Sequence, residues 1–449
     1  MTVHDFVEKL LQKAKQHDLQ AEAFVLEKNS FRAMSHQGEV VEYTSHETRG
    51  LGFRALKDGK MGYASTEAFD EEAIDQLIQG AVASATLCED DDVVYLYDGK
   101  NEEEALAQLP LLDEKASEIT TAQKLDALLT MEKEAMAYDP RIEGVSYNLV
   151  QSGVYTVRIA NTLGLQRSYS ENAFTLYTSP SAKEGTTVSS GDFGKTERSF
   201  VALNPTAIAK EAAKRAVEGL TATSMPTGAY RVIINNEAMC ALLSVFASIF
   251  SAESEQQGLS LLSGKLGQTV ATACVSIVDD PLLVQGLASR PFDAEGVPSK
   301  RHSIIENGVF NTFLHNLKTA NKAGVKTTGN ASKASYGASV WVSPSNFGFV
   351  AGTATLAELC TQAHTGVVIT EVSGLHAGAN PISGDFSLLS KGYFFENGKV
   401  QHAVEQITVA GNFYALLQQV NACGNDVHYD DSGIYSPSID VGTLSISGS

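Results

Sequence analysis

Apolar residues recur at intervals of three and four along several segments of the chain, which is typical of an amphipathic helix. The first such segment places its apolar residues at Val3, Phe6, Val7, Leu10, Leu11 and Ala14. Thr2, with Asp5 three residues later, has the form of a capping box with a shorter acid, so a helix is expected to begin there. The same periodicity predicts further helices over residues 74–85, 125–136 and 205–217.

Apolar and polar residues alternate between these helices, as they do in half-buried strands. Strands are expected at residues 21–26, 39–43, 50–56, 61–65, 144–150, 154–160 and 174–178. An Asp58-Gly59 pair joins two of them and is a strong hairpin signal. An irregular acidic region from Glu89 to about residue 119 separates two blocks of similar element order. We therefore predict an N-terminal domain, residues 1–224, of antiparallel strands flanked by helices, with an internal repeat of residues 1–88 and 120–220.

The pattern of apolar and polar residues changes after a linker-like segment, Thr221-Ala222-Thr223-Ser224-Met225-Pro226-Thr227-Gly228. Beyond it, strands and turns dominate, and only a helix from Glu237 and a short helix over residues 356–363 stand out. This pattern predicts a β-rich C-terminal domain, residues 225–449. The expected fold class for the whole chain is therefore α+β.

Composition narrows the classes of function. The 449 residues are too many for one core, and the formal net charge of -20 disfavours contact with nucleic acid or anionic membranes. Five separated cysteines without a C-x-x-C pair favour reduced thiols in the cytoplasm. The N-terminus does not have the form of a signal peptide, and the longest apolar run, residues 238–250, is too short to cross a membrane.

Several C-terminal motifs resemble, in order, those of the TldD/PmbA peptidase family. They are Asp279-Asp280-Pro281, Phe292-Asp293-Ala294-Glu295-Gly296-Val297-Pro298, Thr327-Thr328-Gly329-Asn330-Ala331, Asn380-Pro381-Ile382-Ser383-Gly384-Asp385-Phe386-Ser387, Thr408-Val409-Ala410-Gly411-Asn412 and Gly424-Asn425-Asp426. The resemblance implies cytosolic proteins of two kinds, which together trim unfolded peptides and mature peptide precursors. One kind carries a zinc site. The other, PmbA-like or TldE-like, lacks the site and pairs with the first.

The position of the family's His-Glu-x-x-x-His motif is occupied by Asn236-Glu237-Ala238-Met239-Cys240-Ala241. Asn236 and Ala241 thus stand where the two zinc-binding histidines would be, and Glu237 is retained from the motif. The resemblance also places Tyr435 where the family has a cysteine ligand. An amide and a methyl group cannot replace two imidazoles, and a neutral tyrosine is a poor zinc ligand near neutral pH. No metal is therefore expected on this chain, and zinc is expected only in a partner subunit.

Other residues are weaker candidates. Glu237 would be the general base of an active member, but a glutamate in the first helical turn is favourable without any such task. A serine-hydrolase trio of Ser387, His376 and Asp385 has no nucleophile elbow, and Ser387 is expected in a polar turn. A remote zinc site drawn from His302, His315, His376 and His428 stays open. The residues expected at a peptide groove or an interface are Asp293, Glu295, Arg301, His376, Asn380 and Asp385.

The leading hypothesis is a metal-free subunit of a peptide-processing assembly that shapes the peptide groove of a zinc-bearing relative. The expected partners are a TldD-like subunit or a second copy of this chain, in a dimer, together with a peptide substrate. One alternative is an autonomous metallopeptidase or other hydrolase with a non-standard site. A weaker alternative follows from the resemblance alone, since the family is also described as a modulator of DNA gyrase. That alternative is a regulatory protein that binds a topoisomerase.

Overall fold

The computed structural model describes residues 1–87, 94–100 and 106–448. Part of the acidic region that was expected to be irregular, including Cys88 and Glu102-Glu103-Glu104, lies outside these residues. Among those described, seven strands form one large antiparallel sheet. They are β1 (Gln20–His36), β2 (Glu39–Lys57), β3 (Lys60–Thr66), β4 (Ile142–Asn161), β5 (Gln166–Glu184), β6 (Thr187–Ser190) and β7 (Phe193–Glu197). Their spatial order is β3-β2-β1-β4-β5-β6, and β7 also pairs with β5.

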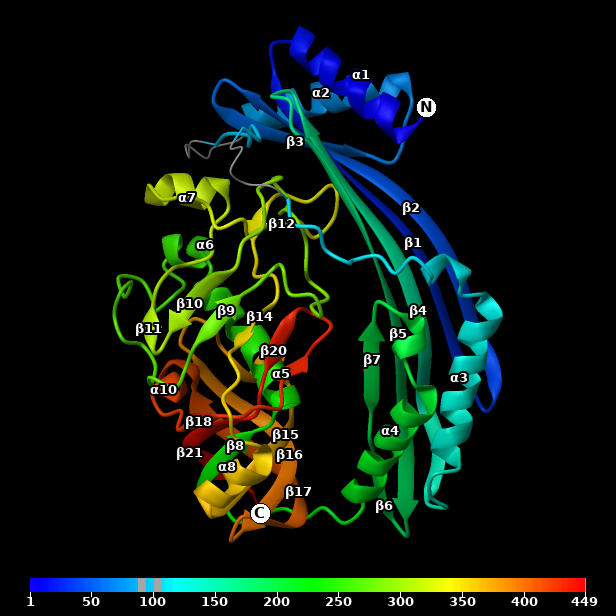
Figure 1. The fold of residues 1–449 in the computed structure, drawn as a ribbon, viewed down its shortest axis with the longest axis vertical. Coiled ribbons are helices and arrows are strands. Elements are labelled where there is room, and N and C mark those ends of the chain that lie inside the picture. The colour runs from blue at the N-terminus through cyan, green and yellow to red at the C-terminus, as the bar shows by residue number, and fades with distance from the viewer. Residues whose placement is uncertain (88–93, 101–105, 449) are drawn as a thin grey trace.

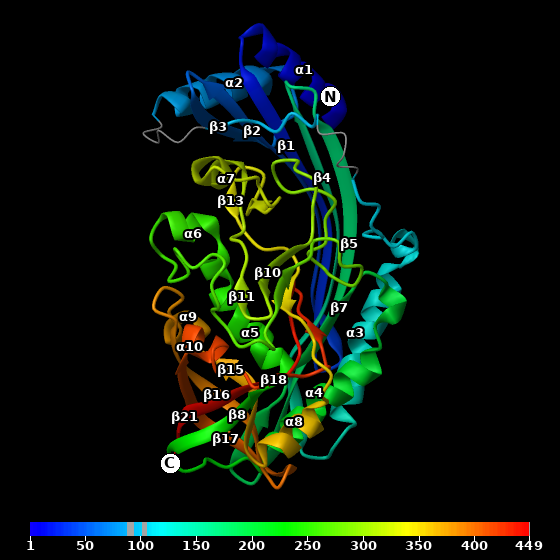
Figure 2. The same cartoon turned by 60° about the vertical axis from the view of Figure 1, so that its left-hand side comes forward.

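Four helices cover one face of this sheet, near its two ends. They are α1 (Val3–Gln16), α2 (Glu71–Thr86), α3 (Thr121–Met136) and α4 (Pro205–Gly219), and the four predicted helices are thereby confirmed. Thr2 caps α1 through a hydrogen bond from the Asp5 backbone N–H (3.2 Å). Alternate residues of β1, including Ala23 and Phe31, pack against these helices, because successive side chains of a strand point to opposite faces. The sheet curves, and the C-terminal part of the chain lies on its concave side (Figures 1 and 2).

The strands are longer than the sequence pattern predicted. The segments expected at residues 39–43 and 50–56 form one strand, β2, and those at 144–150 and 154–160 form β4. Most side chains of residues 39–49 are exposed, so burial does not define this half of β2. Continuous backbone pairing with β1, from Gln20↔Leu56 to His36↔Glu39, holds it instead. Hydropathy alone does not report such pairing, which explains why the sequence showed two short strands.

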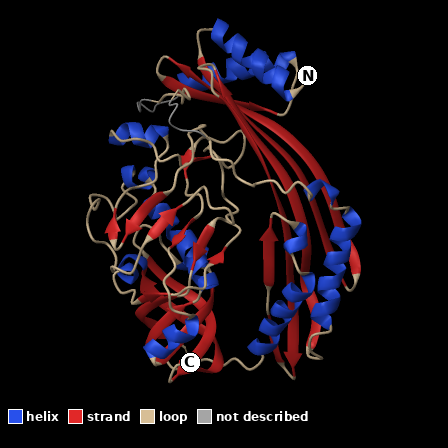
Figure 3. Ribbon diagram, viewed as in Figure 1, coloured by secondary structure: helices blue, strands red, loops and turns tan. Residues whose placement is uncertain are grey.

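The C-terminal part is rich in short strands, as predicted (Figure 3). A six-stranded sheet has the order β17-β16-β15-β8-β21-β18, and an added pairing of β17 with β21 closes five of its strands into a barrel. These strands are β8 (Gly228–Ile234), β15 (Thr365–Ser373), β16 (Asp385–Glu396), β17 (Lys399–Asn412), β18 (Ala422–Cys423) and β21 (Ile439–Ser447). A second sheet contains β9 (Ile277–Asp279), β10 (His302–Glu306), β11 (Val309–Phe310), β14 (Phe347–Phe349), β19 (His428–Tyr429) and β20 (Ile434–Ser436).

A helix at the centre of the C-terminal part, α5 (Asn236–Phe246), packs in its main core against β15 and β20. Both helices expected in this region are present, the second being α8 (Leu356–Ala363). The short helices α6 (Ala252–Gln256), α7 (Leu317–Ala323), α9 (Leu375–Gly378) and α10 (Phe413–Leu417) lack a recognisable sequence signal because each has two turns or fewer. A two-stranded pair joins β12 (Ala331–Ser332) to β13 (Trp341–Val342). Among the described residues, no helix is both long and apolar enough to cross a membrane.

A buried ionic triad fastens the large sheet to the C-terminal part. Arg54 of β2 donates to Glu22 of β1 (Nε to Oε1, 2.8 Å) and to Glu295 in a C-terminal loop (Nη1 to Oε1, 3.0 Å). All three side chains are at most 5% exposed. Close approach nearby requires a glycine, because a Cβ at Gly52 would lie 1.8 Å from the carbonyl oxygen of Tyr336. The two parts of the chain therefore meet through buried contacts.

Replacement of Arg54 should destabilise the protein more than replacement of an exposed arginine of the same sheet. Arg54→Met leaves two buried carboxylates without a cation, which we expect to cost about 3–5 kcal/mol. Arg158→Met removes a pair with Glu27 in which Arg158 is 51% exposed, so it should cost less than about 1 kcal/mol. Denaturant unfolding measures both. Adding Glu22→Gln and Glu295→Gln to Arg54→Met should restore part of the loss, and equal losses for the two single variants would contradict the prediction.

Candidate functional site

The helix that carries the candidate motif begins directly after the inner strand β8. The side chain of Asn235 caps it by accepting a hydrogen bond from the Ala238 backbone N–H (2.8 Å). Met239 and Leu243 are fully buried in the main core, which fixes the rotation of α5 about its axis. The first-turn residue Glu237 and the next-turn residue Ala241 therefore lie on the less buried side of α5, at one pocket.

Glu237 is bound by an arginine from the other part of the chain. Arg215 of α4 donates from Nη1 to Oε2 (2.8 Å) and from Nη2 to Oε1 (2.7 Å), which is a bidentate pair. Burial raises the pKa of Glu237, but the hydrogen bonds and the charge of Arg215 outweigh it, so the pKa lies below its ordinary value. Arg215 is itself held by Glu211 (3.1 Å) and lies over the ring of Phe193. Glu237 is thus an ionised carboxylate that already has a cation.

The other two motif positions make no metal-binding arrangement. The side-chain amide of Asn236 donates to the backbone carbonyl of Asp426 (2.7 Å) and its oxygen accepts from the Glu237 N–H (2.8 Å). Ala241 contributes only a methyl group. Cys240, its neighbour, is buried with its sulfur 3.6 Å from the His428 carbonyl oxygen, and burial raises the pKa of the thiol. A protonated thiol is a poor ligand.

Tyr435 does not face Glu237. It lies on β20, and its hydroxyl donates to the carbonyl of Val278 on β9 (3.4 Å). Burial, together with the charges of Asp279 and Asp280, raises the pKa of this phenol, so it stays neutral near pH 7. Tyr435 and Glu237 therefore belong to different environments.

The residues present do not fit a zinc ion. Zinc needs three or four nitrogen, sulfur or carboxylate donors, and the motif positions supply one carboxylate that is already bound by Arg215. Within the described ranges, no group of three or more His, Cys, Asp or Glu side chains is arranged to hold a metal. This includes the four histidines of the remote alternative. In one of them, His302, the Nε2 atom instead lies 2.8 Å from the carbonyl oxygen of Thr328.

A cavity of about 390 Å³ surrounds Glu237 at the junction of the two parts. Strand β6 and the turn after it, helix α4, and strands β15 to β17 line it. Charged side chains line it beside apolar ones, and Tyr393 donates to Glu218 across the junction (2.8 Å). Lys391 pairs with Glu371 (3.4 Å) on the far wall. The cavity has both polar and apolar walls and adjoins an edge of the large sheet at β6.

Two of the expected groove residues are structural instead. Asp293 is buried, and its carboxylate accepts hydrogen bonds from the backbone N–H groups of Glu295, Val297 and Ala331 (2.9, 2.9 and 3.0 Å). Glu295 joins the triad with Arg54 and accepts from the Leu317 N–H (2.8 Å). A third, Arg301, is 57% exposed and lies 3.6 Å from Asp280. Asp293 and Glu295 therefore hold loops in place where the large sheet meets the C-terminal part.

The remaining candidates lie near the surface. His376 on α9 is exposed, and Asn380 accepts from the N–H groups of Ile382 and Ser383, as a turn former does. Asp385 accepts from Asn412 (2.9 Å), which lowers its pKa. Ser387 lies on strand β16 and not in the polar turn that the sequence suggested, because β17 pairs with it through Ala410. No hydrogen bond links Ser387, His376 and Asp385, so they form no catalytic trio.

Arg215 is the site residue that the sequence did not identify. It lies four residues after Glu211 on an amphipathic helix, where a charge pair is ordinary. Nothing in the sequence relates it to Glu237, 22 residues away across a linker. Only the packing of α4 against the C-terminal part joins them.

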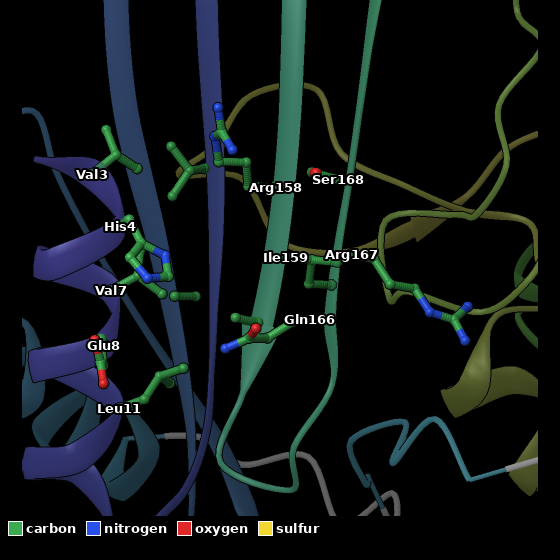
Figure 4. Close-up of a pocket in the computed structure, with 13 residues that line it drawn as sticks. Val3, His4, Val7, Glu8, Leu11, Arg158, Ile159, Gln166, Arg167 and Ser168 are labelled. Atoms are coloured by element: carbon green, nitrogen blue, oxygen red, sulfur yellow. The ribbon is translucent and has the colours of Figure 1, made fainter. Parts of the chain in front are cut away.

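A second pocket, of about 310 Å³, lies between α1 and the large sheet (Figure 4). Val3, Val7 and Leu11 form its helical side, and the figure shows Arg158 and Arg167 pointing in different directions. Arg158 pairs with Glu27 (3.0 Å), and Arg167 donates to the Gly296 carbonyl (2.6 Å). Its charged groups are thus engaged, and none of the residues predicted for the site lines it.

Sequence models for three domains described as PmbA/TldA metallopeptidase domain 1, central domain and C-terminal domain match residues 21–85, 114–220 and 227–448. A Haemophilus influenzae protein named metalloprotease PmbA homolog is 30% identical, over 93% of this chain and 90% of that protein. The structure of a Thermotoga maritima protein proposed to modulate a DNA gyrase superposes with a TM-score of 0.92, at 34% identity, over 99% of this chain and 100% of that one. TldE from Thermococcus kodakarensis has the same fold, with a TM-score of 0.88 at 21% identity over 99% and 100%.

Removal of Arg215 should destabilise the protein in a pH-dependent way. A carboxylate with a lowered folded-state pKa adds stability above its unfolded-state pKa of about 4.3, and this contribution is lost as the pH falls through the folded-state value. We therefore expect Arg215→Met to cost about 1–2 kcal/mol at pH 7, since both side chains are about one-third exposed, and less at pH 4.

The matched control for this experiment is Lys214→Met on the same helix, where the lysine is 49% exposed and 3.9 Å from its acidic neighbours. Denaturant unfolding at pH 7 and pH 4 measures both variants. A loss for Arg215→Met that is equal at the two pH values, or equal to the control, would show that the pair with Glu237 contributes nothing.

Proposed function

Because this chain belongs to the PmbA/TldD metallopeptidase family, we propose that it acts as a metal-free subunit of a cytoplasmic peptide-processing assembly. It would pair with a zinc-bearing relative, or form a dimer with a second copy of itself as an alternative arrangement. The zinc of the relative would supply the Lewis acid for peptide hydrolysis. The present chain would enclose and orient the peptide.

The observation that carries this proposal is the bidentate pair between Arg215 and Glu237. In a metallopeptidase of this family the glutamate would be expected to act beside a metal ion, whereas here a guanidinium occupies both of its oxygens at 2.7 and 2.8 Å. A carboxylate held in this way, with a lowered pKa, is a poor general base near pH 7. The two neighbouring motif positions supply an amide that donates and a methyl group. These facts support a role in binding rather than in bond cleavage.

The surroundings of Glu237 suit an extended peptide. The edge of the large sheet formed by β6 adjoins the cavity, and an extended chain can add to such an edge through backbone hydrogen bonds alone. Recognition through backbone hydrogen bonds depends little on the sequence of the peptide. An assembly that processes unfolded peptides of varied sequence would need this property. The polar cavity walls would then order the peptide without any catalytic side chain of this subunit.

The first test is the metal content of the protein recovered from its native cell. Affinity purification of this chain should recover a relative with an intact His-Glu-x-x-x-His motif, and elemental analysis should assign stoichiometric zinc to the relative alone. Peptide cleavage should follow the pair and be absent from the isolated chain. Recovery of this chain alone, with stoichiometric zinc and chelator-sensitive cleavage, would establish the autonomous hydrolase instead.

A second test restores ligands to the motif. Asn236→His with Ala241→His should increase zinc retention only slightly, because Arg215 keeps a positive charge at Glu237 and repels the ion. Adding Arg215→Met should increase zinc retention further, while adding Lys214→Met, the exposed neighbour on α4, should not. Elemental analysis after dialysis measures all three. If the variants with and without Arg215 retain equal amounts of zinc, the arginine does not prevent zinc binding, and the prediction is wrong.

A further inference from the structure

A small pocket lies on the concave face of the large sheet, where the C-terminal loops cross it. Phe24 and Leu26 of β1 and Tyr169 of β5 form its sheet side, and Arg290 and Lys333 enter from the loops. Its volume is about 130 Å³. This is several times the space of one water molecule but less than a whole ligand usually needs, so the pocket suits the end group of a larger molecule.

Arg290 reaches this pocket without a hydrogen-bonded counter-ion. Its Nε and Nη2 atoms are buried and donate to no acceptor in the described part of the chain. The charges of Asp293, which also lines the pocket, Glu171 and Asp279 act on Arg290. The hydrogen bonds of these carboxylates go elsewhere, since Asp293 accepts three backbone N–H groups, Glu171 pairs with Arg198 (3.4 Å), and Asp279 accepts from Asn330 and Ser345. A buried donor of a charged group costs free energy when it has no acceptor, and native proteins usually provide one. Arg290 is therefore poised to receive an acceptor from outside.

Lys333 provides the second cation. Its ammonium lies 4.9 Å from the centre of the Phe24 ring, and its hydrogen bond to the Tyr336 carbonyl is long at 3.5 Å. Burial, with the charge of Arg54, lowers its pKa to about 8, against the opposing charges of Glu22 and Glu295. The ammonium is thus still mostly protonated at pH 7. Those two acids are bound by Arg54, so neither forms an ion pair with Lys333 within the described residues.

We propose that this pocket binds the C-terminal residue of an extended peptide, with its carboxylate between Arg290 and Lys333. A guanidinium fork matches a carboxylate in two hydrogen bonds, and an ammonium adds a point charge. The aromatic and aliphatic walls would receive the apolar side chain of the same residue. Capture of a terminal carboxylate is an established mode of peptide recognition. Because the chain carries a net charge of -20, a peptide rich in Asp or Glu is a poorer occupant than one terminal carboxylate.

The choice of a peptide as the occupant rests on the proposed function. The observation that Arg290 and Lys333 form no ion pair with a described carboxylate does not depend on that function. Free acetate and inorganic phosphate share the anionic chemistry, so the experiment must separate them from a peptide. Trp341 offers a reporter, because it is the single tryptophan and pairs across β12 and β13 with Ser332 at the pocket. Its fluorescence, with calorimetry on the same samples, gives the dissociation constant.

The test compares acetyl-Ala-Ala-Leu with a free carboxylate, the same peptide as its C-terminal amide, sodium acetate and inorganic phosphate, each titrated into the full chain. The free acid should bind at least about tenfold more tightly than the amide, as one charge-assisted interaction provides. It should also bind more tightly than acetate or phosphate. Equal binding of acid and amide would overturn the proposal, and tighter binding of acetate or phosphate would overturn the peptide assignment.

Variants locate the effect. Arg290→Met and Lys333→Met should each weaken binding of the free acid at least about tenfold and leave the amide unchanged, whereas Arg290→Lys should retain part of the affinity. The matched control is Arg158→Met, which follows the pocket residue Val157 on β4 and points to the opposite face. Circular dichroism and unfolding curves confirm that each variant is folded. A loss in the control equal to that in Arg290→Met would overturn the assignment.

This result is separable from the proposed function. The titration needs neither zinc nor a partner, so failure to bind the free acid would refute the pocket while the paired-subunit role stands. Conversely, zinc bound at Glu237 in the isolated chain would refute that role while carboxylate binding at Arg290 stands.

Discussion

Burial of ionised side chains where the large sheet meets the C-terminal part is the constraint on which this structure depends. A charge removed from water is costly unless it is paired, and two buried or half-buried arginines at this junction take a partner from the opposite part of the chain. Arg54 joins two strands of the sheet to Glu295 in a C-terminal loop, and Arg215 joins α4 to α5. These pairs cross from one part to the other, and they fix which loops face which strands.

The same constraint explains the candidate site. Glu237 is half-buried at the start of α5, where the helix N-terminus favours a negative charge, yet burial alone would raise its pKa. A cation at this point keeps the carboxylate ionised, and here the cation belongs to the protein. The site thereby becomes a fastening between the two parts of the chain. The cavity around it lies beside an edge of the large sheet.

One cation at the junction differs from the others. Arg54, Arg198 and Arg215 each pair with a carboxylate, although Arg54 and Arg198 also hold one buried donor each that no described residue accepts. Arg290 has two such donors and forms no ion pair with a carboxylate among the described residues. An acceptor supplied by a bound molecule would complete the pattern.

The sequence by itself determined the elements and the family. Helical periodicity gave α1 through α4, alternation gave the strands, and the ordered motifs from Asp279 to Asp426 gave the resemblance. It also showed asparagine at position 236 and alanine at position 241, where the resemblance would place histidines, since residue identity needs no structure. These features are local, and local patterns can be identified from the order of residues alone.

The tertiary structure alone decided where distant side chains meet. It merged two predicted strands into β2 through backbone pairing, and it turned Tyr435 towards Val278 and away from Glu237. It placed Asp293 and Glu295 where they hydrogen-bond to loop backbone, and it brought Arg215 to Glu237. Electrostatic pairing and burial act through space, over contacts whose residues are far apart along the chain. For that reason the identities of residues 236, 237 and 241 could be read in the sequence, but the arginine that pairs with Glu237 could not.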